Sequence, residues 1–109
     1  MKRGEVITVS VSGDYGKPRP AVVIQSDWLA SADSVIVCLV SSTLHNTPIY
    51  RLAVQPSASN GLRSPSQVMV DKIIAVRRDK CGRVIGRLDD ETLGSLNRML
   101  ALAIGIADS

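Results

Sequence analysis

The sequence has 109 residues, the size of one small domain, and we expect a single domain over residues 1–109. Hydrophobic residues make up 45% but aromatic residues only 3%, which predicts an aliphatic core and argues against single-strand binding by rows of stacked rings. The formal net charge is +3, and positions 1–88 carry about twice as many basic as acidic residues. This balance favours a polyanionic partner, although a solvated basic surface would look the same.

The chain has no apolar run long enough to span a bilayer, and no long apolar segment follows its basic N-terminus. We therefore expect a cytoplasmic protein without a membrane partner, in which Cys38 and Cys81 stay reduced. A single His and two scattered Cys do not supply a usual zinc ligand set, and no acidic cluster suggests a magnesium or calcium site. The expected chemistry therefore needs no metal and no cofactor.

Short β-type segments fill the first part of the chain. Alternation of apolar and polar residues predicts a half-buried strand over Glu5–Val11. Glycines and prolines predict a loop over Ser12–Pro20, and a strand follows over Ala21–Gln25. Ser26–Asp27 can cap a short helical turn. The continuous β-branched run over Ser34–Val40 predicts a strand that is buried on both faces.

The same alternation of strands and polar connections continues in the second part. Residues typical of turns separate these segments, and the second strand of the group carries charges near its middle that suggest a bend. The expected elements are a loop over Ser41–Pro48, a strand over Ile49–Val54, a loop over Gln55–Ser66, a strand over Gln67–Val76, a turn over Asp79–Gly82 and a strand over Arg83–Leu88.

A helical period begins after Asp89, which is a typical N-cap residue and is followed by two acidic residues in the first turn. Apolar residues then recur at helical spacing, which predicts a helix to Ala107. The apolar stripe is wide, so we expect Leu102 and Ile106 to lie at a subunit contact. Short strands followed by one helix predict a mainly β fold, a small barrel that the C-terminal helix closes.

Four candidate sites interrupt this pattern. Arg19 stands between two prolines before a buried strand, where it can clamp a phosphate or merely cap a carbonyl or pair with an acid. Ser41–Thr43 follows a buried strand, and its hydroxyls can bind a phosphate oxygen or merely form a turn. Asp71 can be an acid–base group, a bulge residue or an ion-pair partner. His45 is the only histidine, and in a polar loop it is more often simply solvated.

Several segments, taken in order, resemble the MazF/PemK family of toxins from toxin–antitoxin pairs. The resemblance lies in Met1–Val6, in Arg19–Asp27, in Val35–Ser42 with its closing pair of serines, in Asp71–Ile73, and in Leu88–Glu91 before a leucine-rich helix. It covers essentially the whole chain. Each segment is short, so the resemblance rests on the fact that all of them occur in the same order as in the family.

The resemblance implies a homodimer of SH3-like barrels that cleaves single-stranded RNA, including mRNA, at short motifs without a metal. The ribose 2′-hydroxyl attacks the adjacent phosphate, giving a 2′,3′-cyclic phosphate and a free 5′-hydroxyl. By this resemblance Arg19 stabilises the developing charge, Ser41 binds a phosphate oxygen, and Asp71 orients or deprotonates. The neighbouring side chains expected to bind RNA are Lys17, Ser42, Thr43, His45, Arg51 and Lys72.

A second resemblance leads to a different function. The short first loop, Gln25–Asp27 and the closing Ile104–Ile106 are similar to the sister CcdB toxins, which share the fold but poison DNA gyrase without catalysis. A binding module that retains only an antitoxin groove is a third interpretation. For a toxin, the basic body predicts an acidic, partly disordered antitoxin, bound between the Ser12–Lys17 and Gln55–Ser66 loops over Arg19.

Overall fold

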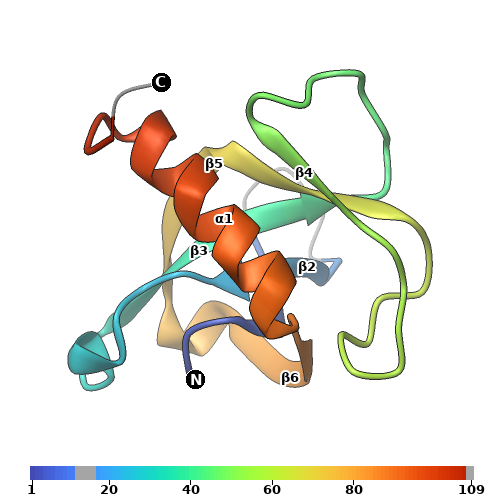
Figure 1. Ribbon diagram of the computed structural model, residues 1–109. Helices are drawn as coiled ribbons and strands as arrows, with labels where there is room; N and C mark the ends of the chain where they lie inside the picture. Colours follow the sequence, from blue (N-terminus) through green and yellow to red (C-terminus); the bar gives the residue numbers. More distant parts are fainter. Residues whose placement is uncertain (12–16, 108–109) are drawn as a thin grey trace.

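The computed structural model describes residues 1–11 and 17–107, and Figure 1 shows the course of the chain. Within these ranges the fold is mainly β, with six strands, one α-helix and two short 3-10 turns. The strands are β1 (Glu5–Val9), β2 (Arg19–Val23), β3 (Ser34–Ser41), β4 (Arg51–Val54), β5 (Ser66–Arg77) and β6 (Cys81–Arg87); the helix is α1 (Asp90–Ala103), and the 3-10 turns are η1 (Asp27–Leu29) and η2 (Arg78–Lys80).

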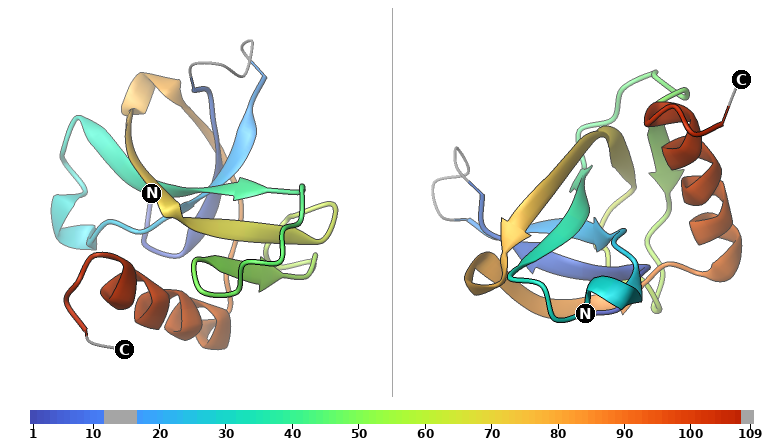
Figure 2. Two further views of the ribbon diagram at one scale, coloured as in Figure 1. Left: turned by 90° about the horizontal axis from the view of Figure 1, so that it is seen from above. Right: turned by 90° about the vertical axis from the view of Figure 1, so that its left-hand side faces the viewer.

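The six strands form one antiparallel sheet in the order β4-β5-β3-β2-β1-β6. The expected barrel is not closed by strand pairing, because β4 and β6 remain the two edges among the described residues. The sheet nevertheless curls strongly (Figure 2), and the loop between β4 and β5 reaches across to β6. There the backbone N–H of Arg87 donates to the carbonyl of Ser59 at 2.8 Å. The fold is therefore barrel-like, with a loop in place of the closing strand pair.

Both faces of the curled sheet carry an aliphatic core. On the face toward α1, Val6, Val22 and Cys38 pack with Leu96 and Leu100 of the helix. On the opposite face a second cluster forms, and its members come from β1, β2, β3 and β5. This cluster is built from Ile7, Val9, Ala21, Val23, Val35, Val37, Leu39, Met69 and Val76. The prediction that the third strand is buried on both faces is confirmed, because successive β3 residues enter the two clusters alternately.

The helix α1 lies against β4 and β5, as the left view of Figure 2 shows. Its predicted N-cap is confirmed: the Asp89 carboxylate accepts a hydrogen bond from the backbone N–H of Thr92 at 2.7 Å. The helix ends at Ala103 rather than Ala107, because Gly105 adopts a left-handed conformation with φ of 80°. The following N–H groups, beginning with that of Ile106, turn back to the carbonyl of Ala101 and stop the helix.

Several strand limits differ from the prediction. The second strand begins at Arg19, and Pro20 is tolerated because it pairs with Thr8 of β1 but not with β3. The fourth strand begins at Arg51, since a turn closed by hydrogen bonds to the carbonyl of Thr47 occupies the two positions before it. The sixth strand already begins at Cys81, directly after η2.

A bend in β5 confirms the expectation for the charged pair near its middle. Cys38 of β3 pairs with Ile73, but two residues later Val40 pairs with Val68, so β5 carries extra residues between these points. Asp71 lies in this irregular stretch, which makes the bulge interpretation of this residue correct.

Candidate active site

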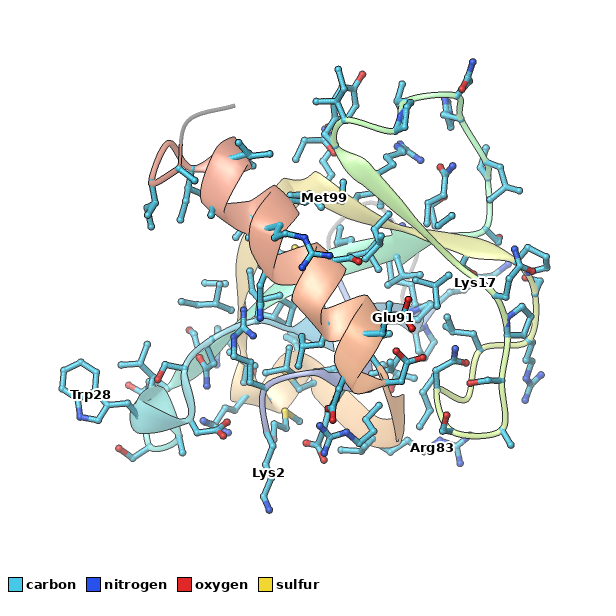
Figure 3. The ribbon with its side chains drawn as sticks, viewed as in Figure 1. Lys2, Lys17, Trp28, Arg83, Glu91 and Met99 are labelled. Carbon is cyan, nitrogen blue, oxygen red and sulfur yellow. The ribbon has the colours of Figure 1, made fainter. Side chains whose placement is uncertain are left out.

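A cleft of about 990 Å³ opens where the ends of several strands meet the long loop between β4 and β5. Among the described residues its lining includes four basic side chains and no acidic one. The lining residues are Thr8, Lys17, Pro18, Arg19, Pro20, Val40, Ser41, Ser42, Thr43, Gly61, Leu62, Arg63, Ser64, Ser66, Arg83, Val84 and Ile85. Figure 3 shows Lys17 and Arg83 on the same side of the molecule, with Trp28 at the opposite end. The cleft is thus a polar, positively charged site suited to a polyanion.

Arg19 enters the cleft as the first residue of β2 and is half-buried. Its Nη2 donates a hydrogen bond to the carbonyl oxygen of Val40, 3.2 Å away on the adjacent strand β3. The carbonyl-capping alternative is therefore observed, and the same contact holds the guanidinium beside Ser41. A fixed guanidinium at the rim of a basic cleft is well placed to meet a phosphate group.

Ser41 is the last residue of β3, and its hydroxyl shapes the turn that follows. The Ser41 Oγ accepts a hydrogen bond from the backbone N–H of Thr43 at 3.1 Å, so the turn-forming alternative is also observed. Ser41, Ser42 and Thr43 all line the cleft. The structure therefore brings three hydroxyl groups to the wall that Arg19 occupies.

The loop between β4 and β5 forms the facing wall and is held from within. Asn60 is buried, and its side chain accepts from the N–H groups of Ser57 and Leu62 and donates to the carbonyl of Gln55. Next to it, Gly61 has a φ of 72° and lies directly against the backbone of Ile85 on β6. Only a residue without a side chain fits both requirements at this position.

Two basic residues of the cleft were missed by reasoning from the sequence. Arg63 stands in the long loop and Arg83 on β6, and both side chains are exposed. The basic charge of the two segments was visible in the sequence. What could not be seen is that β6 returns to pair with β1 and thereby brings Arg83 to the end of β2 that carries Arg19.

The remaining predicted site residues lie outside this lining. His45, Arg51 and Lys72 do not line the cleft, and Arg51 donates instead to the carbonyl of Thr43. Asp71 is exposed in a second groove of about 820 Å³, beside the end of α1. The second groove is lined by Ile49, Tyr50, Val70, Asp71, Ile73, Leu102, Ala103 and Ala107. The predicted set of Arg19, Ser41 and Asp71 is thus divided, with two residues in the cleft and one in the second groove.

Part of the predicted first loop, residues 12–16, lies outside the described residues. Among the residues that are described, no group of three His, Cys, Asp or Glu side chains could hold a metal ion. In the same part of the chain, no helix is long and apolar enough to cross a membrane.

Comparison with known proteins identifies relatives over nearly the whole chain. The sequence model of a family described as PemK-like, MazF-like toxin of type II toxin–antitoxin system matches residues 2–104. A Mycolicibacterium smegmatis protein named probable endoribonuclease MazF is 33% identical over 108 residues, which cover 98% of this chain and 99% of that protein.

Solved structures show the same fold. An endoribonuclease from mycobacterial species, in complex with its cognate antitoxin, has a TM-score of 0.83 at 21% identity, covering 100% of this chain and 99% of that chain. The Mycobacterium tuberculosis toxin MazF-mt6 has a TM-score of 0.79 at 22% identity, with 93% and 96% of the two chains covered. Since the family's sequence model spans almost every residue and one relative is about one-third identical, this chain belongs to the PemK-like, MazF-like toxin family of type II toxin–antitoxin systems.

Proposed function

We propose that this chain is a toxin that acts as a metal-independent endoribonuclease on single-stranded RNA. The observation that carries the proposal is the cleft in which Arg19 and three hydroxyl groups meet three further basic residues, with no acidic residue among the described lining. A cleft of this charge attracts the phosphate backbone of RNA. The M. smegmatis relative named a probable endoribonuclease supports the same activity. We propose that a single toxin domain over residues 1–109 carries this activity.

The proposed reaction is attack of the ribose 2′-hydroxyl on the adjacent phosphorus. The new bond displaces the 5′-oxygen of the next nucleotide, leaving a 2′,3′-cyclic phosphate and a free 5′-hydroxyl. Negative charge grows on the non-bridging oxygens as the fifth bond forms, and Arg19 stabilises it. The Ser41 hydroxyl binds one of these oxygens. Lys17, Arg63 and Arg83 hold the flanking backbone by charge.

The test is cleavage of a defined RNA in the presence of EDTA. Arg19→Ala should lower the rate roughly 10²–10³-fold, as loss of one donor to a developing oxyanion does elsewhere. Arg19→Lys should also be impaired, because an ammonium does not reproduce the planar fork. Arg98→Ala is the matched control, since Arg98 lies on α1 and contacts Ser95 instead of the cleft. Cleavage by Arg19→Ala at the wild-type rate would refute the catalytic role of Arg19. A wild-type protein that cuts no RNA but blocks supercoiling by DNA gyrase would support the alternative function of a gyrase poison.

We further propose that an acidic, partly disordered antitoxin segment neutralises the toxin by occupying the cleft. Its carboxylates would take the places of phosphates beside Arg19, and the mycobacterial relative solved with its cognate antitoxin supports such a partner. Titration of the cognate antitoxin tail against a non-cleavable RNA should show mutual exclusion. Simultaneous, independent binding of both to one toxin would contradict blockade at the cleft. Since both partners would be intracellular, we place the toxin in the cytoplasm.

A homodimer is the assembly we propose, with the second groove and the end of α1 at its interface. Exposed apolar side chains gather there: Ile49 is 82%, Leu102 44% and Ile106 77% exposed. A second copy would remove this surface from water. Leu102→Glu and Ile106→Glu should shift the protein to monomers in sedimentation without a change in the far-UV spectrum. A wild type that sediments as a monomer at micromolar concentration would exclude the homodimer.

A further inference from the structure

We propose that Gln67 and Arg51 are positioning residues that hold the Ser41 hydroxyl in its place at the cleft, an inference that rests on the proposed RNA cleavage. Neither side chain lines the cleft. Both bind the backbone of the segment Ser41–His45, called here the hydroxyl turn, from behind. The proposal also gives Arg51 a role different from the RNA contact that the sequence suggested.

Gln67 binds both backbone groups of one residue in the hydroxyl turn. Its Oε1 accepts from the N–H of His45 at 3.0 Å, and its Nε2 donates to the carbonyl oxygen of His45 at 2.8 Å. Gln67 lies on β5 directly opposite Ser41 of β3 in the sheet register. One side chain therefore fixes the far end of the turn against the strand that pairs with its beginning.

Arg51, on β4, binds the hydroxyl turn as well, and Gln67 and Arg51 together are called the clamp here. Its Nη1 donates to the carbonyl oxygen of Thr43 and to the Oε1 of Gln67, both at 3.3 Å. Arg51 pairs with Met69, two positions along β5 from Gln67, so both side chains lie on the same face of the sheet. The guanidinium is thereby engaged with the turn and with the side chain that clamps it.

These contacts lead directly to the Ser41 hydroxyl. The carbonyl of Thr43 is held by Arg51, and the N–H of the same residue donates to the Ser41 Oγ. Release of the clamp would let this N–H move and would free the hydroxyl to rotate. Misplacement of a reacting group by about 1 Å can reduce a rate by as much as 10²-fold. Because the cleft's basic side chains are untouched, the loss should fall on kcat and not on RNA affinity.

The experiment compares Gln67→Met, Arg51→Met and the double variant with Arg63→Met, which removes a charge from the cleft itself. Cleavage of a defined oligonucleotide gives kcat and KM. Affinity for the same oligonucleotide with a 2′-deoxy sugar at the cut site, measured over a range of salt, gives the number of phosphate contacts. Gln67→Met and Arg51→Met should each lower kcat roughly 10- to 100-fold, with KM close to wild type.

The salt dependence separates positioning from direct binding. Arg63→Met should reduce the slope of log affinity against log salt by about 0.7, the value for one phosphate contact on a single strand. Arg51→Met should keep the wild-type slope. The double variant should lose little more than the worse single variant, because both residues act through the same turn. Gln67→Glu keeps the acceptor for His45 and Arg51, so it should retain more kcat than Gln67→Met.

A wild-type kcat in Gln67→Met, or a reduced salt slope in Arg51→Met, would overturn the proposal. If a Met variant does not fold, Gln67→Glu and Arg51→Lys carry the same comparison. Failure of the wild type to cleave RNA would instead refute the proposed function. The contacts of Gln67 would then be tested by amide hydrogen exchange, which at Thr43 and His45 should be faster in Gln67→Met than in the wild type. Unchanged exchange would refute the positioning role as well.

Discussion

Gly86→Ala tests the contact that replaces strand pairing between the two edges of the sheet. Gly86 lies on β6, where the backbone of the long loop passes over it. A methyl group at this position would lie 2.6 Å from the carbonyl oxygen of Asn60 and closer still to that of Ser59. Both neighbours are backbone atoms, so the loop itself must move by most of an ångström. That shift breaks the hydrogen bond from the N–H of Arg87 to the carbonyl of Ser59.

The expected cost combines overpacking, about 1–3 kcal/mol, with one lost hydrogen bond, about 1 kcal/mol. Gly86→Ala should therefore lower the melting temperature by roughly 10–20 °C in a domain of this size. Gly94→Ala is the matched control, because Gly94 lies within α1 and its added methyl group meets nothing closer than Arg98 at 3.8 Å. It should raise the free energy of unfolding by about 1 kcal/mol. Thermal unfolding measures both, and a Gly86→Ala protein as stable as wild type would show that the loop does not press on β6.

Two further predictions concern titratable groups. Burial, reinforced by the charge of Asp71, raises the pKa of the Cys38 thiol to about 12. In the native protein this thiol should therefore not react with a disulfide reagent near neutral pH. Fast reaction of both thiols, Cys38 and Cys81, would contradict the burial of Cys38. The hydrogen bond from the N–H of Thr92 lowers the pKa of the Asp89 carboxyl. The ionised carboxylate therefore stabilises the fold at pH values above the ordinary pKa of an aspartate. This stabilisation disappears as the pH falls through the lowered pKa of Asp89. The melting difference between wild type and Asp89→Ala should therefore shrink from about pH 6 to about pH 3, and a constant difference would contradict a charged cap.

Local patterns predicted the strands and the helix because they depend on near neighbours. The β-branched run of β3 and the cap of α1 at Asp89 were both recognisable from a few residues. The end of the helix was missed because apolar periodicity continues past Gly105, while the left-handed conformation of that glycine stops the backbone. A hydrophobic pattern indicates which side chains can be buried, but the backbone conformation determines where a helix ends.

The cleft was only partly predictable, because its walls come from segments distant in the chain. Arg19 and Ser41 were found through local signals, a proline-flanked arginine and hydroxyls at the end of a strand. Arg83 depends on the pairing of β6 with β1, and Arg63 on the packing of the long loop against β6. Arg51 was expected to bind RNA together with its neighbours, whereas its hydrogen bonds go to the carbonyl of Thr43 and to Gln67. Charge alone does not distinguish a contact with substrate from one with the backbone.

The position of Asp71 leads to the last prediction. A carboxylate that acts on the 2′-hydroxyl must reach the phosphate that Arg19 holds, but within one protomer Asp71 lines the second groove with Leu102 and Tyr50. In the proposed dimer this groove is covered, and a covered carboxylate loses hydration. Asp71→Asn removes the charge and keeps the shape. We therefore expect it to leave kcat within about threefold of wild type and to tighten the dimer.

Cleavage rates measured well above the dimer dissociation constant, together with sedimentation, separate the two roles of this residue. Asp79→Asn is the control, because that carboxylate is exposed in an ion pair with Arg77 at 2.6 Å. If Asp71→Asn instead lowers kcat a hundredfold or more with an unchanged dimer, the carboxylate takes part in the chemistry. The second groove of one subunit would then have to lie beside the cleft of the other. Within one protomer Arg19 and Ser41 line the cleft, whereas Asp71 lines the second groove, so only the partner's Asp71 could reach the cleft.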